Sequence, residues 1–143
     1  MSFLLDVNVL IALIDETHIY HATAHRWFAK QSSGGWTSCP ITENGVIRIV
    51  GSPGYGNFPG NPAIAIESLQ SLLARPGHVF WADDISLLDS IKVDASRLLT
   101  SAQVTDSYLL ALARAHGGRL ATLDRKLITD AVVGGVESLY VIR

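Results

Sequence analysis

Cysteine is nearly absent from this chain, and charged residues of either sign are sparse. The single cysteine, Cys39, cannot form a disulfide within the chain or supply a cysteine-cluster metal site. Charged residues make up 17% of the 143 residues and the net charge is −2, so no broad basic surface for nucleic acid is expected. This balance argues against a non-catalytic DNA-binding module. It argues less against an enzyme that holds a phosphate through a metal ion.

Long apolar runs are also missing, although hydrophobic residues make up 48% of the chain. No uncharged apolar run approaches the roughly 18 residues that a membrane span requires. The first residues lack a basic segment and include Asp6, Asp15 and Glu16, so a signal peptide is not expected. We therefore expect a cytoplasmic protein, with residues 1–143 folding as one domain around a sizeable core.

Short buried strands alternate with helices along the chain. Strands are expected at residues 3–5, 35–39, 78–81, 119–123 and 139–142. Helices are expected at residues 9–14, 19–31, 41–50, 63–74 and 102–116, with shorter ones within 86–99 and 125–130. This alternation predicts an α/β fold with a mostly parallel, doubly wound sheet. The segment 51–62 is rich in Gly and Pro, which break regular structure, so it is predicted to be a surface loop or an interface element. It lacks the pattern of a phosphate-binding loop, so that role is not predicted.

Asp6 is a single acid in an apolar run, placed where the first strand ends and the first helix begins. Ligands bind at this edge of an open α/β sheet, at the carboxyl ends of the strands. A carboxylate buried there requires a cation or hydrogen bonds to offset its lost hydration. Asp124 follows the strand at 119–123 in the same way. Either acid could also serve as a helix N-cap.

Two further acids lie near the starts of predicted helices. Glu43 and Asp106 each precede three apolar residues of their own helix by three, four and seven positions, which places them on the inward face. An acid near a helix N-terminus is also favoured by the helix dipole, so each could simply stabilise its helix.

Together, these four acids predict a metal site. A parallel sheet brings strand ends and the following helix starts to one edge, where Asp6, Glu43, Asp106 and Asp124 would converge. Carboxylates this close raise one another's pKa unless a cation is present. Oxygen ligands favour a hard ion, Mg²⁺ or Mn²⁺, over zinc. Such a site is suited to hydrolysis of phosphodiester bonds.

Four motifs carry a family resemblance. They are LLDVNVLIAL at 4–13, ITENGVIRI at 41–49, VTDSYLLALA at 104–113 and LATLDRKL at 120–127. In these motifs the chain resembles the PIN-domain ribonucleases, and most closely the VapC toxins of bacterial toxin–antitoxin pairs. The motifs occur in the expected order and span nearly the whole chain. The resemblance implies a PIN-like α/β/α sandwich whose central sheet has about four or five strands.

The resemblance also implies roles for individual residues. Asp6 and Asp106 would bind Mg²⁺ (or Mn²⁺) directly, and Glu43 and Asp124 would complete the catalytic pocket, directly or through water. Asn8 and Thr105 would support these ligands without contacting the metal ion themselves. The implied function is an endoribonuclease toxin that cleaves transfer or ribosomal RNA and so inhibits translation and growth. The implied partners are a VapB-type antitoxin and a second copy of the chain.

Basic and histidine side chains invite separate interpretations. Arg48, Arg125 and Lys126 are candidates for binding RNA phosphates, although ordinary solvated charges would give the same pattern. His21 and His25 share a helix face, but no HExxH motif accompanies them, so a structural role is favoured over zinc binding.

Two other functions stay open at this point. A phosphatase of the haloacid-dehalogenase type would use Asp6 as its nucleophile, but Asn8 stands where its general acid is needed. A non-catalytic interaction module would use the acids only as helix caps. No role is predicted for the loop at Gly51–Pro62.

Overall fold

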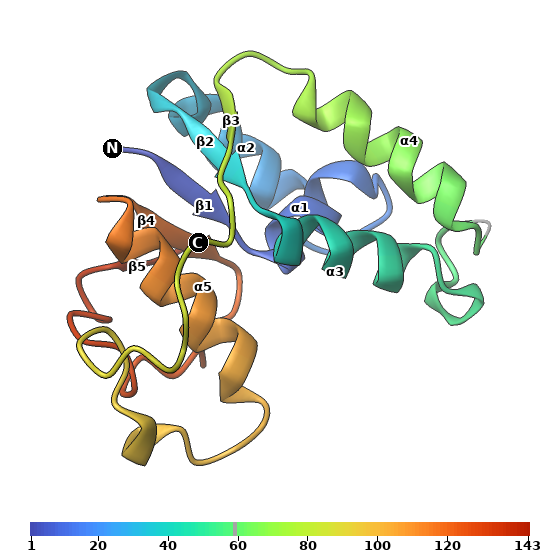
Figure 1. Ribbon diagram of the computed structural model, residues 1–143. Helices are drawn as coiled ribbons and strands as arrows, with labels where there is room; N and C mark the ends of the chain where they lie inside the picture. The colour runs from blue at the N-terminus through green and yellow to red at the C-terminus, as the bar shows by residue number, and fades with distance from the viewer. Residues whose placement is uncertain (59) are drawn as a thin grey trace.

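Within residues 1–58 and 60–143, which the computed structural model describes, a five-stranded sheet lies between layers of helices (Figure 1). The strands are β1 (Phe3–Leu5), β2 (Trp36–Ser38), β3 (His78–Phe80), β4 (Arg119–Thr122) and β5 (Leu139–Val141). Their order across the sheet is β3-β2-β1-β4-β5, and every neighbouring pair is parallel. The predicted α/β fold with a parallel sheet is therefore confirmed.

Strand β1 lies at the centre of the sheet and contributes to both hydrophobic cores. Phe3 and Leu5 join the core on one face, whereas Leu4 joins the core on the other, as the two-residue period of a strand requires. Leu4 is aligned with Leu120 of β4. A continuous apolar run is typical of a parallel strand that is covered on both faces.

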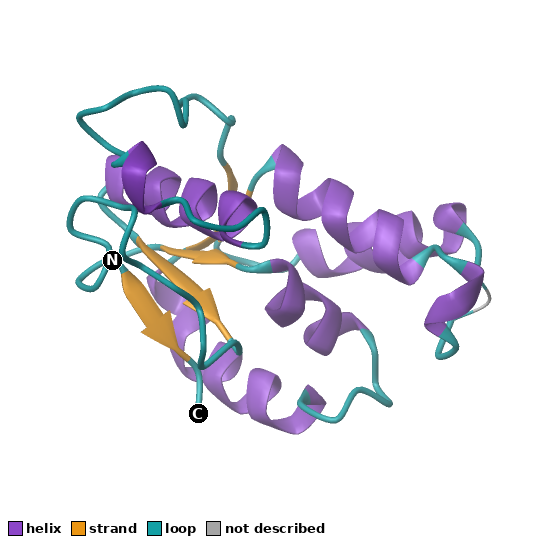
Figure 2. Ribbon diagram, turned by 90° about the horizontal axis from the view of Figure 1, so that it is seen from below, coloured by secondary structure: helices purple, strands orange, loops and turns teal. Residues whose placement is uncertain are grey.

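Helices cover both faces of the sheet (Figure 2). Those whose apolar residues join the core around Phe3 and Leu5 are α1 (Val7–Ile14), α2 (His21–Gln31), α3 (Pro40–Val50) and α4 (Pro62–Leu73). Helix α5 (Gln103–Ala115) packs on the opposite face, over Leu4 and Leu120. Helices α3 and α4 pack side by side and extend away from the sheet (Figure 1).

The short helices predicted within 86–99 and at 125–130 do not form as α-helices. Residues 86–99 form turns with one 3₁₀ segment, η3 (Ala95–Arg97), and residues 125–130 form turns and irregular backbone. In both segments aspartate side chains accept hydrogen bonds from nearby backbone N–H groups, as Asp94 does from Ser96 and Asp124 does from Lys126. Such local bonds compete with the helical pattern.

The loop between α3 and α4 is fastened to the end of α1. Tyr55 Oη and Asn57 Nδ2 both donate to Asp15 Oδ2, and Asp15 is only 1% exposed. The segment at 51–62 is thus a loop that hydrogen bonds hold against α1. Residue 59 lies outside the described residues. Among the described residues, none of the helices combines the length and hydrophobicity that a membrane span requires.

Candidate active site

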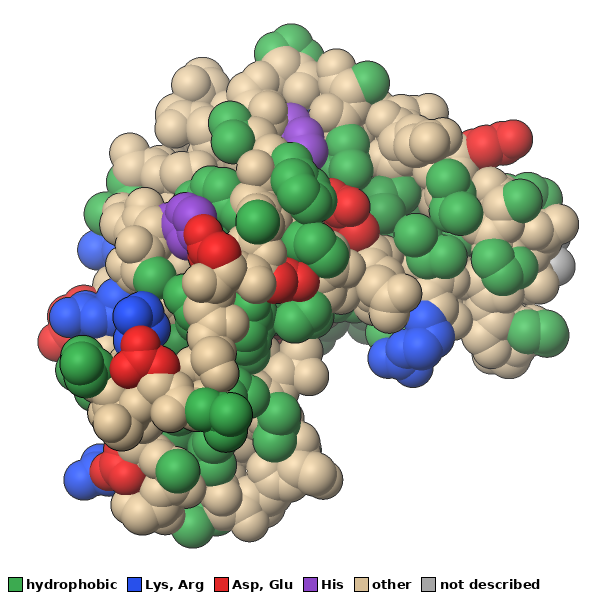
Figure 3. All heavy atoms as spheres, viewed as in Figure 1, with side chains coloured by type: hydrophobic (Ala, Val, Ile, Leu, Met, Phe, Trp, Pro, Cys, Tyr) green, Lys and Arg blue, Asp and Glu red, His purple; other side chains and the backbone are tan. Residues whose placement is uncertain are grey.

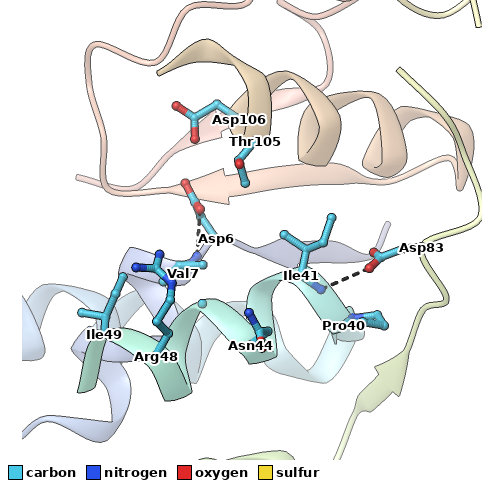
Figure 4. A pocket seen from close by; sticks show the side chains of 11 residues that line it. Asp6, Val7, Pro40, Ile41, Asn44, Arg48, Ile49, Asp83, Thr105 and Asp106 are labelled. Carbon is cyan, nitrogen blue, oxygen red and sulfur yellow. Dashed lines mark hydrogen bonds between the residues drawn. The ribbon is translucent and has the colours of Figure 1, made fainter. Parts of the chain in front are cut away.

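Three aspartates meet at the carboxyl edge of the central strands. Asp6 follows β1 and caps α1, Asp124 follows β4, and Asp106 lies in the first turn of α5. Figure 4 shows the carboxylates of Asp6 and Asp106 facing each other from opposite walls of a cavity. The charges of Asp6 and Asp124 both contribute to raising the pKa of Asp106, so all three lie within electrostatic reach of one another.

Asp6 is held rigidly and is 6% exposed. Its Oδ1 accepts the Val7 backbone N–H at 2.7 Å, and its Oδ2 accepts the Thr122 hydroxyl at 2.8 Å. Burial raises the pKa of Asp6, the bonds from Thr122 and Val7 lower it, the charge of Asp124 raises it, and the net shift is upward. Asp6 is therefore a helix cap and also a poorly neutralised buried acid.

Asn8 and Thr122 join the two strand ends behind Asp6. Asn8 Nδ2 lies 3.4 Å from Asp6 Oδ2 and 3.1 Å from Thr122 Oγ1, and Asn8 Oδ1 accepts the Leu123 N–H at 3.0 Å. Sequence reasoning missed Thr122, although its place as the last residue of β4, two positions before Asp124, was a usable signal.

Asp106 has a less stabilised carboxylate than Asp6. Among the described residues, no group donates a hydrogen bond to it, and it is partly buried. Burial, together with the charges of Asp6 and Asp124, raises its pKa from 3.8 to about 6. Thr105, the preceding residue, is exposed and lines the same cavity.

The cavity between α3 and α5 has a volume of about 720 Å³. Its walls come from the start of α1, one face of α3, the start of α5 and Asp83 (Figure 4). From the outside, the molecule is hollowed between α5 and the α3–α4 pair (Figure 3). Arg48 lines this cavity from α3, so a cation faces the acids across the hollow.

Gly45 allows α3 to approach α1 at the cavity wall. A Cβ at this position would lie 2.8 Å from Val7 Cγ2, closer than side-chain carbons normally come. A larger residue would push α3 away from the helix that Asp6 caps. The glycine of the ITENG motif is therefore a packing requirement of the site.

Glu43 does not line the cavity, and its carboxylate contacts Ser38. Glu43 Oε2 accepts the Ser38 hydroxyl at 2.6 Å, and His78 Nε2 lies 2.8 Å from the same hydroxyl. Glu43 is not among the residues that line the cavity, which on α3 include Ile41, Asn44 and Arg48. Because helix positions turn by about 100°, Glu43 lies on the neighbouring face of α3.

Asp83 lines the cavity, although sequence reasoning did not assign it to the site. Its Oδ2 accepts the Ile41 N–H at 3.1 Å, and its buried Oδ1 has no hydrogen-bond partner among the described residues. Asp83 follows β3 closely, as Asp124 follows β4. Applying the strand-end argument to all strands would have found it.

The donor set fits a hard divalent cation held by few protein ligands. In the described part of the chain, no three His, Cys, Asp or Glu side chains are grouped closely enough to hold one ion together. Asp6 and Asp106 offer oxygen atoms that are incompletely neutralised. Mg²⁺ is commonly bound by one or two carboxylates with water and substrate phosphate completing its shell.

The histidines of α2 have a structural explanation. His21 Nδ1 lies 2.7 Å from the Ala12 carbonyl oxygen, and His25 Nε2 lies 3.1 Å from that of Leu13. Both rings therefore satisfy carbonyls in the last turn of α1, which have no partners within their own helix.

Comparisons with known proteins identify the family of this chain. A sequence model of the PIN domain matches residues 3–131. Ribonuclease VapC44 of Mycobacterium tuberculosis is 45% identical over 137 residues, which cover 96% of each chain. Ribonuclease VapC39 of the same species is 45% identical over 139 residues, covering 97% of this chain and 100% of the relative. The chain therefore belongs to the PIN-domain family and, within it, to the VapC ribonucleases.

Proposed function

We propose that this protein is the endoribonuclease toxin of a toxin–antitoxin pair and that it hydrolyses RNA with Mg²⁺ or Mn²⁺. The observation that carries the proposal is the buried carboxylate of Asp6 facing the partly buried Asp106 across a 720 Å³ cavity. PIN-domain ribonucleases generally depend on divalent metal ions, which is consistent with an all-oxygen donor set. The family also favours this function over the phosphatase and the non-catalytic alternatives.

Asp6 and Asp106 are the residues that would hold the metal ion, and Asp124 would add negative charge beside them. A bound divalent ion supplies activation of water and neutralisation of phosphate charge. Thr122 and the Val7 N–H fix the orientation of the Asp6 carboxylate before substrate arrives. Asn8 supports this arrangement by linking Asp6 to β4.

Arg48 and Glu43 have different proposed roles around this centre. Arg48 lies on the cavity wall and would bind a phosphate oxygen of the RNA. Glu43 would contact the metal ion only through water, because its carboxylate accepts a hydrogen bond from the Ser38 hydroxyl. Thr105 lies beside Asp106 at the cavity and would help to orient the substrate.

The VapC family implies an RNA substrate and a VapB-type antitoxin partner. We further propose that the substrate is a transfer RNA or a ribosomal RNA loop, whose cleavage arrests translation. Homodimerisation is proposed from the family alone.

The test is RNA cleavage by the purified protein with Mg²⁺, with Mn²⁺ and with EDTA. Cleavage is expected with either metal and not with EDTA, and sequencing the RNA ends after induced expression would identify the target. Metal-independent cleavage would contradict the proposal, and so would a stable beryllium fluoride adduct on Asp6, which indicates phosphatase chemistry.

A further inference from the structure

A second pocket, of about 330 Å³, opens on the other side of the acids. We call it the basic pocket; its lining includes Tyr20, Asp124, Arg125, Lys126 and Arg143. The main cavity is lined by Asp6 and Asp106 and not by Asp124, whereas the basic pocket is lined by Asp124 and by neither of the other two. The three aspartates therefore lie between the two hollows.

Positive charge is concentrated at the basic pocket. Three cations, Arg125, Lys126 and Arg143, surround one acid in a protein whose net charge is −2. The salt bridges among the described residues involve Lys92, Arg97 and His116, and none of them involves these three cations. Their charges are therefore available to an anionic ligand.

Hydrogen bonds fix the backbone of the turn at the pocket edge, which carries Arg125 and Lys126. Asp124 Oδ1 accepts the Lys126 N–H at 2.8 Å, and the Asp124 N–H donates to Thr122 Oγ1 at 3.1 Å. The same Thr122 hydroxyl contacts Asp6. The backbone of this turn is thus linked through three hydrogen bonds to the carboxylate of Asp6 at the candidate metal centre.

An aromatic side chain completes the pocket. Tyr20 is 49% exposed, and its backbone N–H is fixed by His18 Nδ1 at 3.0 Å. Cations beside an exposed aromatic ring are the combination that binds single-stranded nucleic acid, because phosphates pair with the cations and a base stacks on the ring. The main cavity supplies Arg48 on the opposite side.

We propose that the basic pocket is a subsite for single-stranded RNA, binding the phosphate next to the one that is cleaved. The RNA backbone would run from the Arg48 cavity, across the three aspartates, to Arg125, Lys126 and Arg143, with one base on Tyr20. This inference rests on the proposed endoribonuclease function. It adds a requirement for at least one further nucleotide on the Asp124 side of the cleaved bond.

The test measures binding of a fluorescent single-stranded RNA oligonucleotide to the full chain in EDTA, which prevents cleavage. Lys126→Gln is compared with Lys30→Gln, the same exchange at an exposed position in the last turn of α2. Lys126→Gln is expected to weaken binding about fivefold and to reduce the salt dependence by about 0.7 in log–log slope, because one phosphate contact is lost. Arg125→Gln should behave likewise, whereas Lys30→Gln should match the unmodified protein.

Tyr20→Leu separates stacking from charge. It is expected to weaken RNA binding without changing the salt dependence, because no phosphate contact is removed. Equal RNA binding by Lys126→Gln and Lys30→Gln would overturn the proposal that the basic pocket binds RNA, whatever the cleavage assay shows. Absence of metal-dependent cleavage by the unmodified protein would instead overturn the proposed function, and the RNA path with it.

Discussion

A buried aspartate lies at each end of helix α1, and the pKa values of the two side chains are shifted in opposite directions. Asp6 at the N-terminus is 6% exposed and Asp15 at the C-terminus is 1% exposed. Burial raises the pKa of both side chains. At Asp15, hydrogen bonds from Tyr55, Asn57 and Thr17 outweigh burial and lower the pKa to about 2. At Asp6, burial and the nearby charge of Asp124 outweigh the hydrogen bonds, and the pKa is raised.

This difference distinguishes a structural carboxylate from one that is prepared for a ligand. Asp15 accepts four hydrogen bonds, two on each oxygen, so its charge is satisfied within the fold. Asp6 has fewer donors and has other acids as neighbours, so its charge is less well stabilised within the fold. The exposed fractions of the two aspartates are similar, so burial alone does not distinguish them.

The largest expected effect is on catalysis, from Asp6→Asn. Asparagine keeps an oxygen to accept the Val7 N–H, so the helix cap and the fold should persist. RNA cleavage should fall by at least about a hundredfold, because a charged metal ligand is lost. Calorimetric titration with Mn²⁺ should show weakened binding.

Asp15→Asn is the matched control for this variant, because it makes the same exchange at the other end of α1. It should retain Mn²⁺ binding when folded. If Asp6→Asn cleaved RNA normally, or if Asp15→Asn lost metal affinity to the same degree, the contrast between the two ends would be wrong.

The next effect is on stability, from Asp15→Asn. The new amide would present donor groups to Tyr55 and Asn57, so hydrogen bonds to a buried charge would be lost. The free energy of unfolding at pH 7 should fall by about 2 kcal/mol, as measured by urea denaturation. Since the pKa of Asp15 is lowered from 3.8 to about 2, this contribution should be lost as pH falls through that window. Amide exchange should accelerate in the loop around residues 52–58.

Asp106 should show the opposite dependence on pH in the metal-free protein. Its pKa is raised from 3.8 to about 6, so the folded state binds the proton more tightly and stability falls as pH rises through that window. Asp106→Asn should therefore stabilise the metal-free protein at pH 8 by about 1 kcal/mol, after allowing for solvent screening. At pH 3.5 the difference should vanish.

Thermal unfolding in EDTA at both pH values measures this effect of Asp106→Asn. Added Mn²⁺ should stabilise the unmodified protein more than the variant, because ligand binding adds to folding stability. A variant that is less stable than the unmodified protein at pH 8 would argue against mutual repulsion among the acids.

The smallest expected effect on catalysis is from Glu43→Gln. Glu43 is engaged with Ser38 and lies outside the cavity lining, so its removal should reduce cleavage by about tenfold and leave Mn²⁺ affinity nearly unchanged. Ser38→Ala is the companion variant, since it frees Glu43 without removing its charge. A loss of cleavage by Glu43→Gln as large as that of Asp6→Asn would place Glu43 among the direct metal ligands.

Much of the fold and part of the candidate site could be predicted from the sequence. The alternation of strands and helices predicted the parallel sheet, because periodicity and turn residues are local signals. Asp6, Asp106 and Asp124 could be expected to converge, because parallel strands end at one edge.

Other features depended on contacts between residues distant in sequence. Tyr55 and Asn57 reach Asp15 across 40 and 42 positions, and only folding shows that they neutralise it. Helical spacing put Glu43 on an inward face, but the buried Ser38 hydroxyl decides where its carboxylate points. Thr122 meets Asp6 across 116 positions.

The sequence by itself determined the fold class and the edge of the sheet where acids gather, because local patterns specify strands, helices and their ends. The tertiary structure alone decided which acids are satisfied and which are left for a ligand. A carboxylate's pKa depends on the donors and charges that surround it in space, and those neighbours come from the whole chain. Asp6 and Asp15 are the same residue type on one helix, and their surroundings set them apart.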